Sequence, residues 1–431
     1  MNASSQERIE DKRVDDERVD IVIAGGGYVG LGLALALKTA DPTLDILVAD
    51  IRPTAAIARD ERASAIVDAG RALLDRLGVW DEIAPHAQPI ESMIVTDSRL
   101  RDAARPVFLT FAQGPKANGP EGVETAEPDR PFAHMVPNSA MVGALAKAAT
   151  EAGIAIEAPQ AVEDFTDEGS AMAVHLADGR TVRATLLVAA DGVRSKLRDL
   201  AGIRTVRWDY GQAGIVTTVS HERPHNGRAE EHFLPSGPFA ILPLTGNRSS
   251  LVWTEKRDEA ERLVKEDDFV FQLELERRFG KHLGTVKVAG PRFAYPLGLT
   301  LARDWIRPRF ALAGDSAHGI HPISGQGLNM GFRDIAALAE TIIDARRLGL
   351  DFGAVDILQR YERWRRFDTW QMGVVTDVLN RLFSNDIDAV RLVRDVGLGI
   401  VDRMPWLKRL FMEEAKGAAG DSPKLLRGEA L

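Results

Sequence analysis

The residues that could do chemistry in this chain gather in three glycine-rich stretches, each of which contains an aspartate. The longest stretch covers residues 310–334, FALAGDSAHGIHPISGQGLNMGFRD. It reads as a short buried strand, an acidic turn at Gly314-Asp315, a loop rich in Gly, Pro, Ser and His, and the start of a helix. N–H groups at a helix start attract negative charge, and glycines let a ligand approach the backbone closely. The stretch therefore predicts a site for a flat, electron-rich ligand, with the carboxylate of Asp315 beside it to bind a hydroxyl group.

A second glycine-rich stretch follows an apolar run at residues 19–24, VDIVIA, which is typical of a buried parallel strand. Its six residues are Gly25-Gly26-Gly27-Tyr28-Val29-Gly30. We expect an apolar helix over residues 31–38 and another strand over residues 46–49, which Asp50 closes 20 residues after Gly30. Glycines in such a turn allow close approach of a pyrophosphate, and an acid at this distance binds ribose hydroxyls. The pattern predicts dinucleotide binding.

The third stretch is Asp191-Gly192-Val193-Arg194-Ser195-Lys196-Leu197-Arg198, directly after an apolar run at residues 186–190. Asp-Gly is a common turn, so one interpretation is a simple turn that opens a helix. His318 and His321 raise the question of a metal site near Asp315. We predict none, because the segment is a loop and no further His or Glu ligand is close in sequence.

Several elements must position these stretches. Buried strands are expected at residues 93–96 and 181–190, and helices at residues 65–77, 138–151 (capped by Asn138) and 267–283. Residues 214–219 and 232–253 alternate apolar and polar residues around turns, which predicts an antiparallel sheet. Five apolar residues of this sheet could line an aromatic pocket or form its core: Phe233, Phe239, Ile241, Leu242 and Trp253. Residues 113–131 predict a long loop, and residues 335–410 are expected to be helical, with a basic, solvated face at 361–366.

Composition narrows the class of protein. The chain has 431 residues, a formal net charge of −9 and no cysteine. The negative charge argues against nucleic acid as a partner, and the absence of Cys excludes disulfides and thiolate metal sites. No run of about eighteen apolar residues is present, so no membrane span is predicted. A short apolar and basic segment at residues 405–412 predicts contact with its own protein, a membrane surface or a partner protein.

Together the three stretches resemble, in order and spacing, the fingerprints of the class A FAD-dependent monooxygenases. The segment from His321 to Asp334 is similar to the signature of the ubiquinone-biosynthesis hydroxylases within that class. The resemblance implies an α/β fold with a Rossmann-like FAD-binding domain of the para-hydroxybenzoate hydroxylase type, an inserted antiparallel-sheet substrate domain and a helical C-terminal region. The expected parts are a disordered leader at 1–19, an FAD-binding domain at 20–90, 132–205 and 290–345, a substrate domain at 91–131 and 206–289, and C-terminal helices at 346–431.

The resemblance also implies the cofactor and the residues that bind it. FAD is expected to bind non-covalently, NAD(P)H to dock transiently as co-substrate, and O₂ to react through a flavin C4a-hydroperoxide. Arg62 is expected along the cofactor phosphates, with Arg52 and Arg59 as weaker alternatives. His321 and Pro322 are weak candidates for a place near the flavin ring, and no protein residue is assigned the chemistry itself. The expected FAD-binding residues are Gly25, Gly27, Tyr28, Val29, Gly30, Asp50, Arg62, Asp191, Gly192, Gly314, Asp315, Pro322, Gly325, Gly327, Leu328 and Asn329.

The implied function is hydroxylation of a prenylated phenol, a hydrophobic aromatic small molecule, in ubiquinone biosynthesis. It implies a cytoplasmic protein that can lie at the inner membrane or contact a biosynthetic complex. A flavin-dependent halogenase is disfavoured because no two of the seven tryptophans form a Trp-x-Trp pair. Two alternatives stay open: a flavin-dependent reductase of a prenyl lipid, and a flavin-bearing scaffold without turnover.

Overall fold

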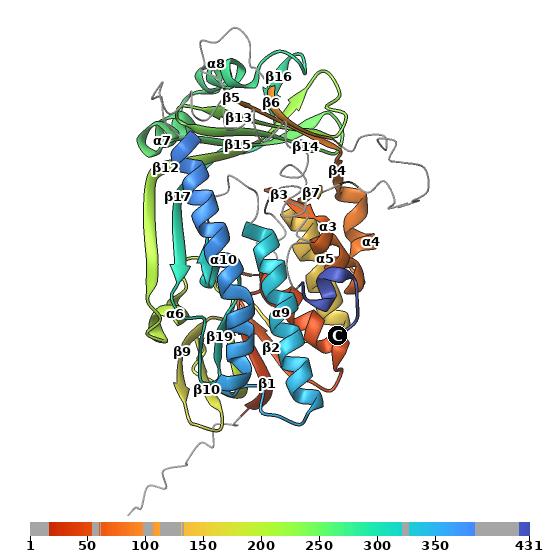
Figure 1. The fold of residues 1–431 in the computed structure, drawn as a ribbon, viewed down its shortest axis with the longest axis vertical. Helices are drawn as coiled ribbons and strands as arrows, with labels where there is room; N and C mark the ends of the chain where they lie inside the picture. The colour runs from red at the N-terminus through yellow and green to blue at the C-terminus, as the bar shows by residue number, and fades with distance from the viewer. Residues whose placement is uncertain are drawn as a thin grey trace, which may run out of the picture.

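The computed structural model describes residues 17–53, 60, 62–97, 107–112, 131, 133–320, 327–383 and 422–431. Two large sheets dominate this part of the chain (Figure 1). The apolar and basic segment at residues 405–412 and the loop predicted at residues 113–131 cannot be compared, because residues 405–412 and 113–130 lie outside the described residues.

The first sheet has eight strands around a parallel centre, in the order β18-β19-β11-β1-β2-β8. Its central strands are almost completely buried apolar runs, as expected of a parallel sheet covered on both faces. Strands β10 and β9 extend it in antiparallel fashion beside β11. The strands are β1 (Glu17–Ala24), β2 (Ile46–Ala49), β8 (Ala155–Glu157), β9 (Val162–Asp167), β10 (Met172–Leu176), β11 (Thr181–Ala189), β18 (Ile306–Arg307) and β19 (Phe310–Leu312).

The second sheet has nine strands, nearly all antiparallel, in the order β20-β17-β12-β15-β14-β13-β5-β6 with β16 beside β12. Its long pair, β12 and β17, runs from Thr205 opposite Ala302 to Val216 opposite Phe293 and connects the regions of the two sheets (Figure 1). The strands are β5 (Ser92–Asp97), β6 (Val107–Ala112), β12 (Thr205–His221), β13 (Arg228–Leu234), β14 (Gly237–Leu244), β15 (Arg248–Lys256), β16 (Val286–Val288), β17 (Phe293–Ala302) and β20 (His318–Gly319).

A small third sheet, β3 (Ala63–Val67), β7 (Ala133–Pro137) and β4 (Gln88–Ile90), lies between the large ones (Figure 1). The helices and 3₁₀ turns are α1 (Tyr28–Ala40), α3 (Asp68–Arg76), α4 (Trp80–Ile83), η1 (Ala84–His86), α5 (Asn138–Glu151), α6 (Lys196–Leu200), α7 (Arg257–Lys265), α8 (Asp268–Phe279), η2 (Gly314–Ser316), α9 (Gly327–Arg347), α10 (Val355–Phe383) and η4 (Lys424–Arg427). Among the described residues, none of these helices is both long enough and apolar enough to span a bilayer.

Two local predictions are wrong in detail. The helix expected from residue 65 begins at Asp68, because residues 63–67 pair with β7 as strand β3. The helix expected over residues 138–151 is present, but Asn138 is its first residue rather than its cap. The Asn138 side chain instead accepts a hydrogen bond from Ser64 Oγ (2.8 Å) and donates one to Asp60 Oδ2 (3.2 Å).

The second sheet has two different faces. Helices α7 and α8 cover its outer face, where Phe239, Ile241 and Trp253 form a core with Phe271 and Leu275 of α8. Its other face is turned toward the small sheet and the beginning of α9 (Figure 1). A sheet that is packed on one face only leaves the other available to line a cavity.

Candidate active site

The stretch Gly25–Gly30 forms the turn between β1 and α1. Gly25 has φ = 121°, and a Cβ there would lie 2.2 Å from the carbonyl oxygen of Ala190. A Cβ on Gly30 would lie 1.9 Å from the carbonyl oxygen of Gly25. Only glycine fits either position. A Cβ on Gly27, by contrast, would meet no described atom within 4 Å, so the backbone here borders open space that a ligand can reach.

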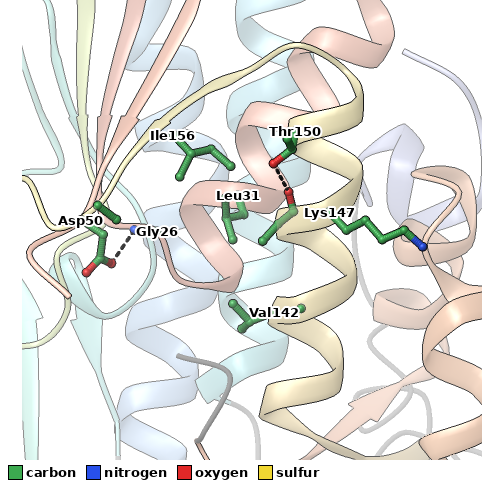
Figure 2. A pocket seen from close by; sticks show the side chains of 10 residues that line it. Gly26, Leu31, Asp50, Val142, Lys147, Thr150 and Ile156 are labelled. Carbon is green, nitrogen blue, oxygen red and sulfur yellow. Dashed lines mark hydrogen bonds between the residues drawn. The ribbon is translucent and has the colours of Figure 1, made fainter. Parts of the chain in front are cut away.

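Asp50 closes β2 beside this turn, as predicted, and its side chain is only 4% exposed. Its Oδ2 accepts a hydrogen bond from Gly26 N (2.6 Å), and its Oδ1 accepts one from Arg52 N (2.7 Å). The carboxylate borders a pocket of about 400 Å³, whose apolar wall includes Leu31, Val142 and Ile156 (Figure 2). An acid beside a small apolar pocket can bind the hydroxyls of a nucleoside and enclose its base.

The stretch Asp191–Arg198 begins beside the Gly25–Gly30 turn and reaches the turn at Gly314-Asp315. Gly192 has φ = 85°, and Ser195 caps α6, since its Oγ accepts a hydrogen bond from Arg198 N (3.0 Å). The guanidinium of Arg198 is fully buried and donates to the carbonyl oxygens of Ser316 (2.9 Å) and Val193 (3.2 Å). Arg198 therefore ties the Asp191–Arg198 segment to the turn that carries Asp315, which is more than a simple Asp-Gly turn would do.

The stretch at residues 310–334 forms the acidic turn after β19. Gly314 has φ = 67°, and a Cβ there would lie 2.8 Å from Cγ2 of Val29 in the Gly25–Gly30 stretch. The contacts Gly25–Ala190, Arg198–Ser316 and Gly314–Val29 thus bring all three stretches together at one end of the parallel sheet. This is the end at which ligands bind in open α/β sheets.

A buried aspartate that the sequence did not single out holds this turn. Asp334, in the second turn of α9, accepts hydrogen bonds from Gly314 N (2.8 Å) and Arg365 Nε (2.9 Å), and its Oδ2 lies 2.5 Å from His318 Nε2. Arg365 comes from α10, where Tyr361 also donates a hydrogen bond to Leu312 O (2.8 Å). The prediction that the basic face at residues 361–366 is solvated is therefore wrong for Tyr361 and Arg365, because both are buried.

Electrostatics differ between the two aspartates. Burial alone would raise the pKa of Asp334, but the nearby His318 and Arg365 outweigh it and hold that pKa below its usual range. Asp315 is accessible from the cavity yet surrounded by protein, and this burial, together with Asp334, raises the pKa of its carboxyl against the opposing effect of His318. Burial, with Asp315 and Asp334 nearby, also raises the pKa of Tyr28 well above its usual value, so the phenol remains a hydrogen-bond donor.

A larger cavity of about 790 Å³ extends from Asp315 and the first turn of α9 to the open face of the second sheet. Gly327, Leu328 and Asn329, the residues expected at the flavin ring, line its beginning. Among the described atoms, a Cβ on Gly327 would meet only Ile320 Cγ1, at 3.9 Å. The Asn329 side chain accepts from Val67 N (3.1 Å) and donates to Ala65 O (2.9 Å), so it fixes α9 to strand β3.

Of the three arginines considered for the phosphates, Arg62 lines this cavity. Its guanidinium donates to both carboxylate oxygens of Asp60 and lies 5.4 Å from the ring centre of Tyr295. Arg52 instead pairs with Asp50 (3.2 Å). Arg59 lies outside the described residues, as do three further predicted site residues: His321, Pro322 and Gly325.

Two of the aromatic residues suggested for a pocket, Phe239 and Trp253, do not line the cavity. Phe239, Ile241 and Trp253 belong to the core on the outer face, because alternate residues of a strand point to opposite faces. Leu242 does line the cavity, with other aliphatic residues from four strands. These are Pro238 and Ala240 of β14, Val252 of β15, Ala229 of β13, and Leu297 and Leu299 of β17.

The residues present fit FAD. Tightly packed glycines shape the turn at Gly25 and Gly30, whereas Gly27 and Gly327 border open space in which a cofactor can lie against the backbone. The acid Asp50 faces one pocket and Asp315 the other. In the part of the chain that the structure describes, no three His, Asp or Glu side chains come together in a group that could hold a metal ion.

Comparison with known proteins agrees with this geometry. The model of a family described as "FAD binding domain" matches residues 18–373. The "Ubiquinone hydroxylase UbiL" of Rhodospirillum rubrum is 46% identical, over 96% of this chain and 94% of its own. The "3-demethoxyubiquinol 3-hydroxylase" of Escherichia coli is 31% identical, over 93% of this chain and 99% of its own. The chain belongs to the ubiquinone-biosynthesis hydroxylase family of FAD-dependent monooxygenases.

The fold of the hydroxylase has solved counterparts. The p-nitrophenol 4-monooxygenase PnpA from Pseudomonas putida aligns with a TM-score of 0.76 over 94% of this chain and 100% of its own, at 19% identity. This likeness concerns the fold alone, and it confirms the predicted fold class. The hydroxylase is thus an FAD-dependent enzyme.

Proposed function

We propose that this hydroxylase adds one oxygen atom to the ring of a prenylated phenol in ubiquinone biosynthesis, with NAD(P)H and O₂ as co-substrates and by way of a flavin C4a-hydroperoxide. One observation carries the proposal. A single cavity joins the start of α9, where we expect the flavin ring, to a wall of aliphatic side chains on the open face of the second sheet.

When bound, FAD would supply the oxygen chemistry: it takes electrons from NAD(P)H, reacts with O₂ and gives one oxygen atom to the ring. The protein binds and orients it. Asp50 would accept hydrogen bonds from the ribose hydroxyls, and Asp315 from the ribityl or pyrophosphate end. The backbone N–H groups at Gly327 and Leu328 open a helix, so they would stabilise negative charge on the flavin ring. Glycines Gly27 and Gly192 would allow the pyrophosphate to approach.

The cavity wall suits a substrate with an apolar tail. The wall includes four side chains without polar atoms, those of Leu242, Val252, Leu297 and Leu299. Burial of a hydrocarbon against such a wall is favourable by about 25 cal/mol per Å². Trp208 lines the same cavity and is 51% exposed. We propose that the tail leaves the cavity past this ring.

A prenyl tail would also determine where the protein works. We propose a cytoplasmic enzyme that contacts the surface of the inner membrane or a biosynthetic complex when it takes up this substrate.

Non-covalent binding of FAD is part of the proposal, because the sequence has no Cys for a thioether link. NAD(P)H would dock transiently, since the sequence contains one complete dinucleotide fingerprint and FAD requires it.

Loss of the gene tests the proposal. Mass spectrometry of lipid extracts from a deletion strain should show a prenylated phenol that lacks one hydroxyl group of the final quinone. The wild-type gene should remove this precursor and Asp315→Ala should not, whereas Asp344→Asn, a surface change on α9, should behave as wild type. Accumulation of a precursor that differs from its product by two hydrogens would indicate a prenyl-lipid reductase. Unchanged quinone lipids would contradict the proposal.

A further inference from the structure

Glu231 carries a buried carboxyl group on the cavity face of β13. The proposed function described above assigns no role to this group. Its side chain is 9% exposed and lines the cavity of about 790 Å³ that also contains Gly327 and Asp315. Among the described residues, no hydrogen bond or ion pair reaches this carboxyl, although buried carboxyl groups normally have partners. An unpartnered group of this kind is suited to a ligand that enters the cavity.

The strands around Glu231 explain why it has no partner. On its two sides in the sheet it lies opposite Ala240 of β14 and Val95 of β5. The next residue across the sheet on the cavity face is Val252, opposite Ala240. These neighbours offer neither donors nor positive charge. Burial therefore raises the pKa of Glu231 to about 8, and no charged side chain opposes this.

The preceding residue shows the contrast. Glu230 points to the other face of the same strand, where it meets Arg228 (2.6 Å), His232 (3.2 Å) and His282 (2.8 Å). Although burial opposes ionisation, these partners hold the pKa of Glu230 well below its usual range. Two adjacent glutamates thus occupy opposite environments. One is satisfied within the protein, and the other is not.

The other ionisable groups near the cavity have partners of their own. Arg62 pairs with Asp60 (2.6 Å), and Arg257 with Asp209 (2.6 Å). Further ionisable groups on elements packed against β13 or around the cavity include Tyr28 of α1, Asp97 of β5, Glu255 of β15 (2.9 Å from Arg278), Arg207 of β12 (3.9 Å from Asp199) and Asp315. None of them bonds to Glu231, so we expect this carboxyl to titrate alone.

We propose that Glu231 receives the hydroxyl group of the aromatic substrate and accepts its proton as the ring is hydroxylated. This rests on the proposed function and adds a catalytic residue to it. The O–H bond of the phenol breaks, its electron pair moves into the ring, and an O–H bond forms on the carboxylate. This makes the ring electron-rich at the carbon that takes the oxygen atom. That carbon takes one atom of O₂ as a hydroxyl group, and the other atom, reduced with the electrons of NAD(P)H, takes up the proton that the carbon releases and leaves as water. The original phenol oxygen takes a proton back from Glu231.

The chemistry requires a base of this kind. A phenol has a pKa of about 10, so at neutral pH it is protonated and much less reactive than its anion. A base is most effective when its pKa lies near the working pH, and such a group typically contributes 10²–10⁴-fold in rate. Glu231, with a pKa of about 8, meets this condition and lines the cavity.

The first experiment measures binding, not turnover. The FAD-loaded enzyme is titrated with a short-chain prenylated phenol and with its O-methyl ether, between about pH 6 and 9.5. In the wild type, the phenol should bind roughly ten-fold or more tightly as pH rises through about 8, because only the ionised carboxyl accepts its hydrogen bond strongly. The ether has no proton to donate and should show no such gain. Glu231→Gln should abolish the difference between the ligands.

The second experiment measures hydroxylation. Glu231→Gln should lower kcat by about a hundred-fold or more at pH 8 and keep its FAD. Its rate should recover as pH approaches about 10, where the phenol ionises without help. Glu231→Asp should restore part of the activity. The matched control is Glu230→Gln, which removes a carboxylate from the same strand but should leave the pH profile of kcat unchanged.

Two results would overturn the proposal. One is that phenol and ether bind alike at every pH in the wild type, and the other is that Glu231→Gln hydroxylates at the wild-type rate. If the wild type hydroxylates no prenylated phenol at all, the proposed function fails on its own. The binding contrast would then still decide whether Glu231 receives a phenolic hydroxyl.

Discussion

Replacement of Asp334 by asparagine should destabilise the hydroxylase and weaken its hold on FAD. The carboxylate is completely buried, and it contacts the side chains of Arg365 and His318 and the backbone N–H of Gly314. Asparagine has nearly the same shape, but it is neutral and accepts through one oxygen only. If that oxygen stays on Arg365, the amide NH₂ faces Gly314 N and His318.

The magnitude follows from these contacts. Breaking one side of a buried ion pair costs about 3–5 kcal/mol, since a buried charge is left without its counter-charge. We expect a loss of this size for Asp334→Asn. The control is Asp344→Asn on the same helix, whose partner Arg360 is 47% exposed (2.8 Å); such surface pairs contribute about 0–1 kcal/mol. Because Asp334 holds Gly314, the turn that carries Asp315 should also shift.

Urea unfolding at pH 7 measures the loss, with tryptophan fluorescence as signal, since Trp305 lies 5.4 Å from the His318 ring. FAD content after gel filtration measures the effect on the site. The pKa of Asp334 is lowered, so its stabilisation should be complete above about pH 4 and be lost only in stronger acid. If Asp334→Asn unfolds within about 1 kcal/mol of Asp344→Asn and keeps its FAD, Asp334 does not hold the turn.

Three further predictions concern the two ends of the cofactor site and the cavity. Asp50→Ala should lose a charge-assisted hydrogen bond worth about 1.5–3 kcal/mol, hence roughly ten- to a hundred-fold in FAD affinity by fluorescence titration; affinity within about a factor of two of wild type would refute its role. Gly327→Val should fold and retain FAD, because Ile320 is the only described residue near its Cβ, but it should displace the flavin ring and release H₂O₂ from NAD(P)H with about a hundred-fold less hydroxylated product; wild-type coupling would show that the ring does not lie at this helix start. Glu231 keeps its proton to about pH 8 in the folded protein but releases it near pH 4.5 in the unfolded chain, so the free energy of unfolding should fall by up to ~5 kcal/mol as pH rises between these values. Urea unfolding at several pH values should show this fall for the wild type and not for Glu231→Gln.

The parts of the site that are local in sequence could be predicted. The glycine turn, Asp50 and the acidic turn are each specified within a few residues by backbone geometry, and the structure brings all three stretches together. The buried strands and the antiparallel sheet also follow from their apolar patterns. The exact start of α3 could not be predicted, because residues 63–67 pair with β7 as strand β3 although their local pattern favours a helix.

The remaining features depend on contacts between distant residues. Nothing local shows that Arg365, 31 residues after Asp334, turns inward to meet it. Likewise, alternation predicts two faces for the second sheet but not which face α8 covers, so the aromatic residues were as consistent with a pocket as with a core. The difference between Glu230 and Glu231 arises from the groups on the two faces of β13, and it could not be predicted from two adjacent identical residues.

Hydroxylation with labelled oxygen tests the central claim most directly. The purified, FAD-loaded enzyme is incubated with NAD(P)H, a short-chain prenylated phenol and ¹⁸O₂, and the product is weighed by mass spectrometry. We predict a product that carries one ¹⁸O atom on the ring, formed only when NAD(P)H and the phenol are both present. A product that has gained two hydrogens and no ¹⁸O, or NAD(P)H consumption that the phenol does not stimulate, would contradict the assignment of this protein as an aromatic-ring hydroxylase.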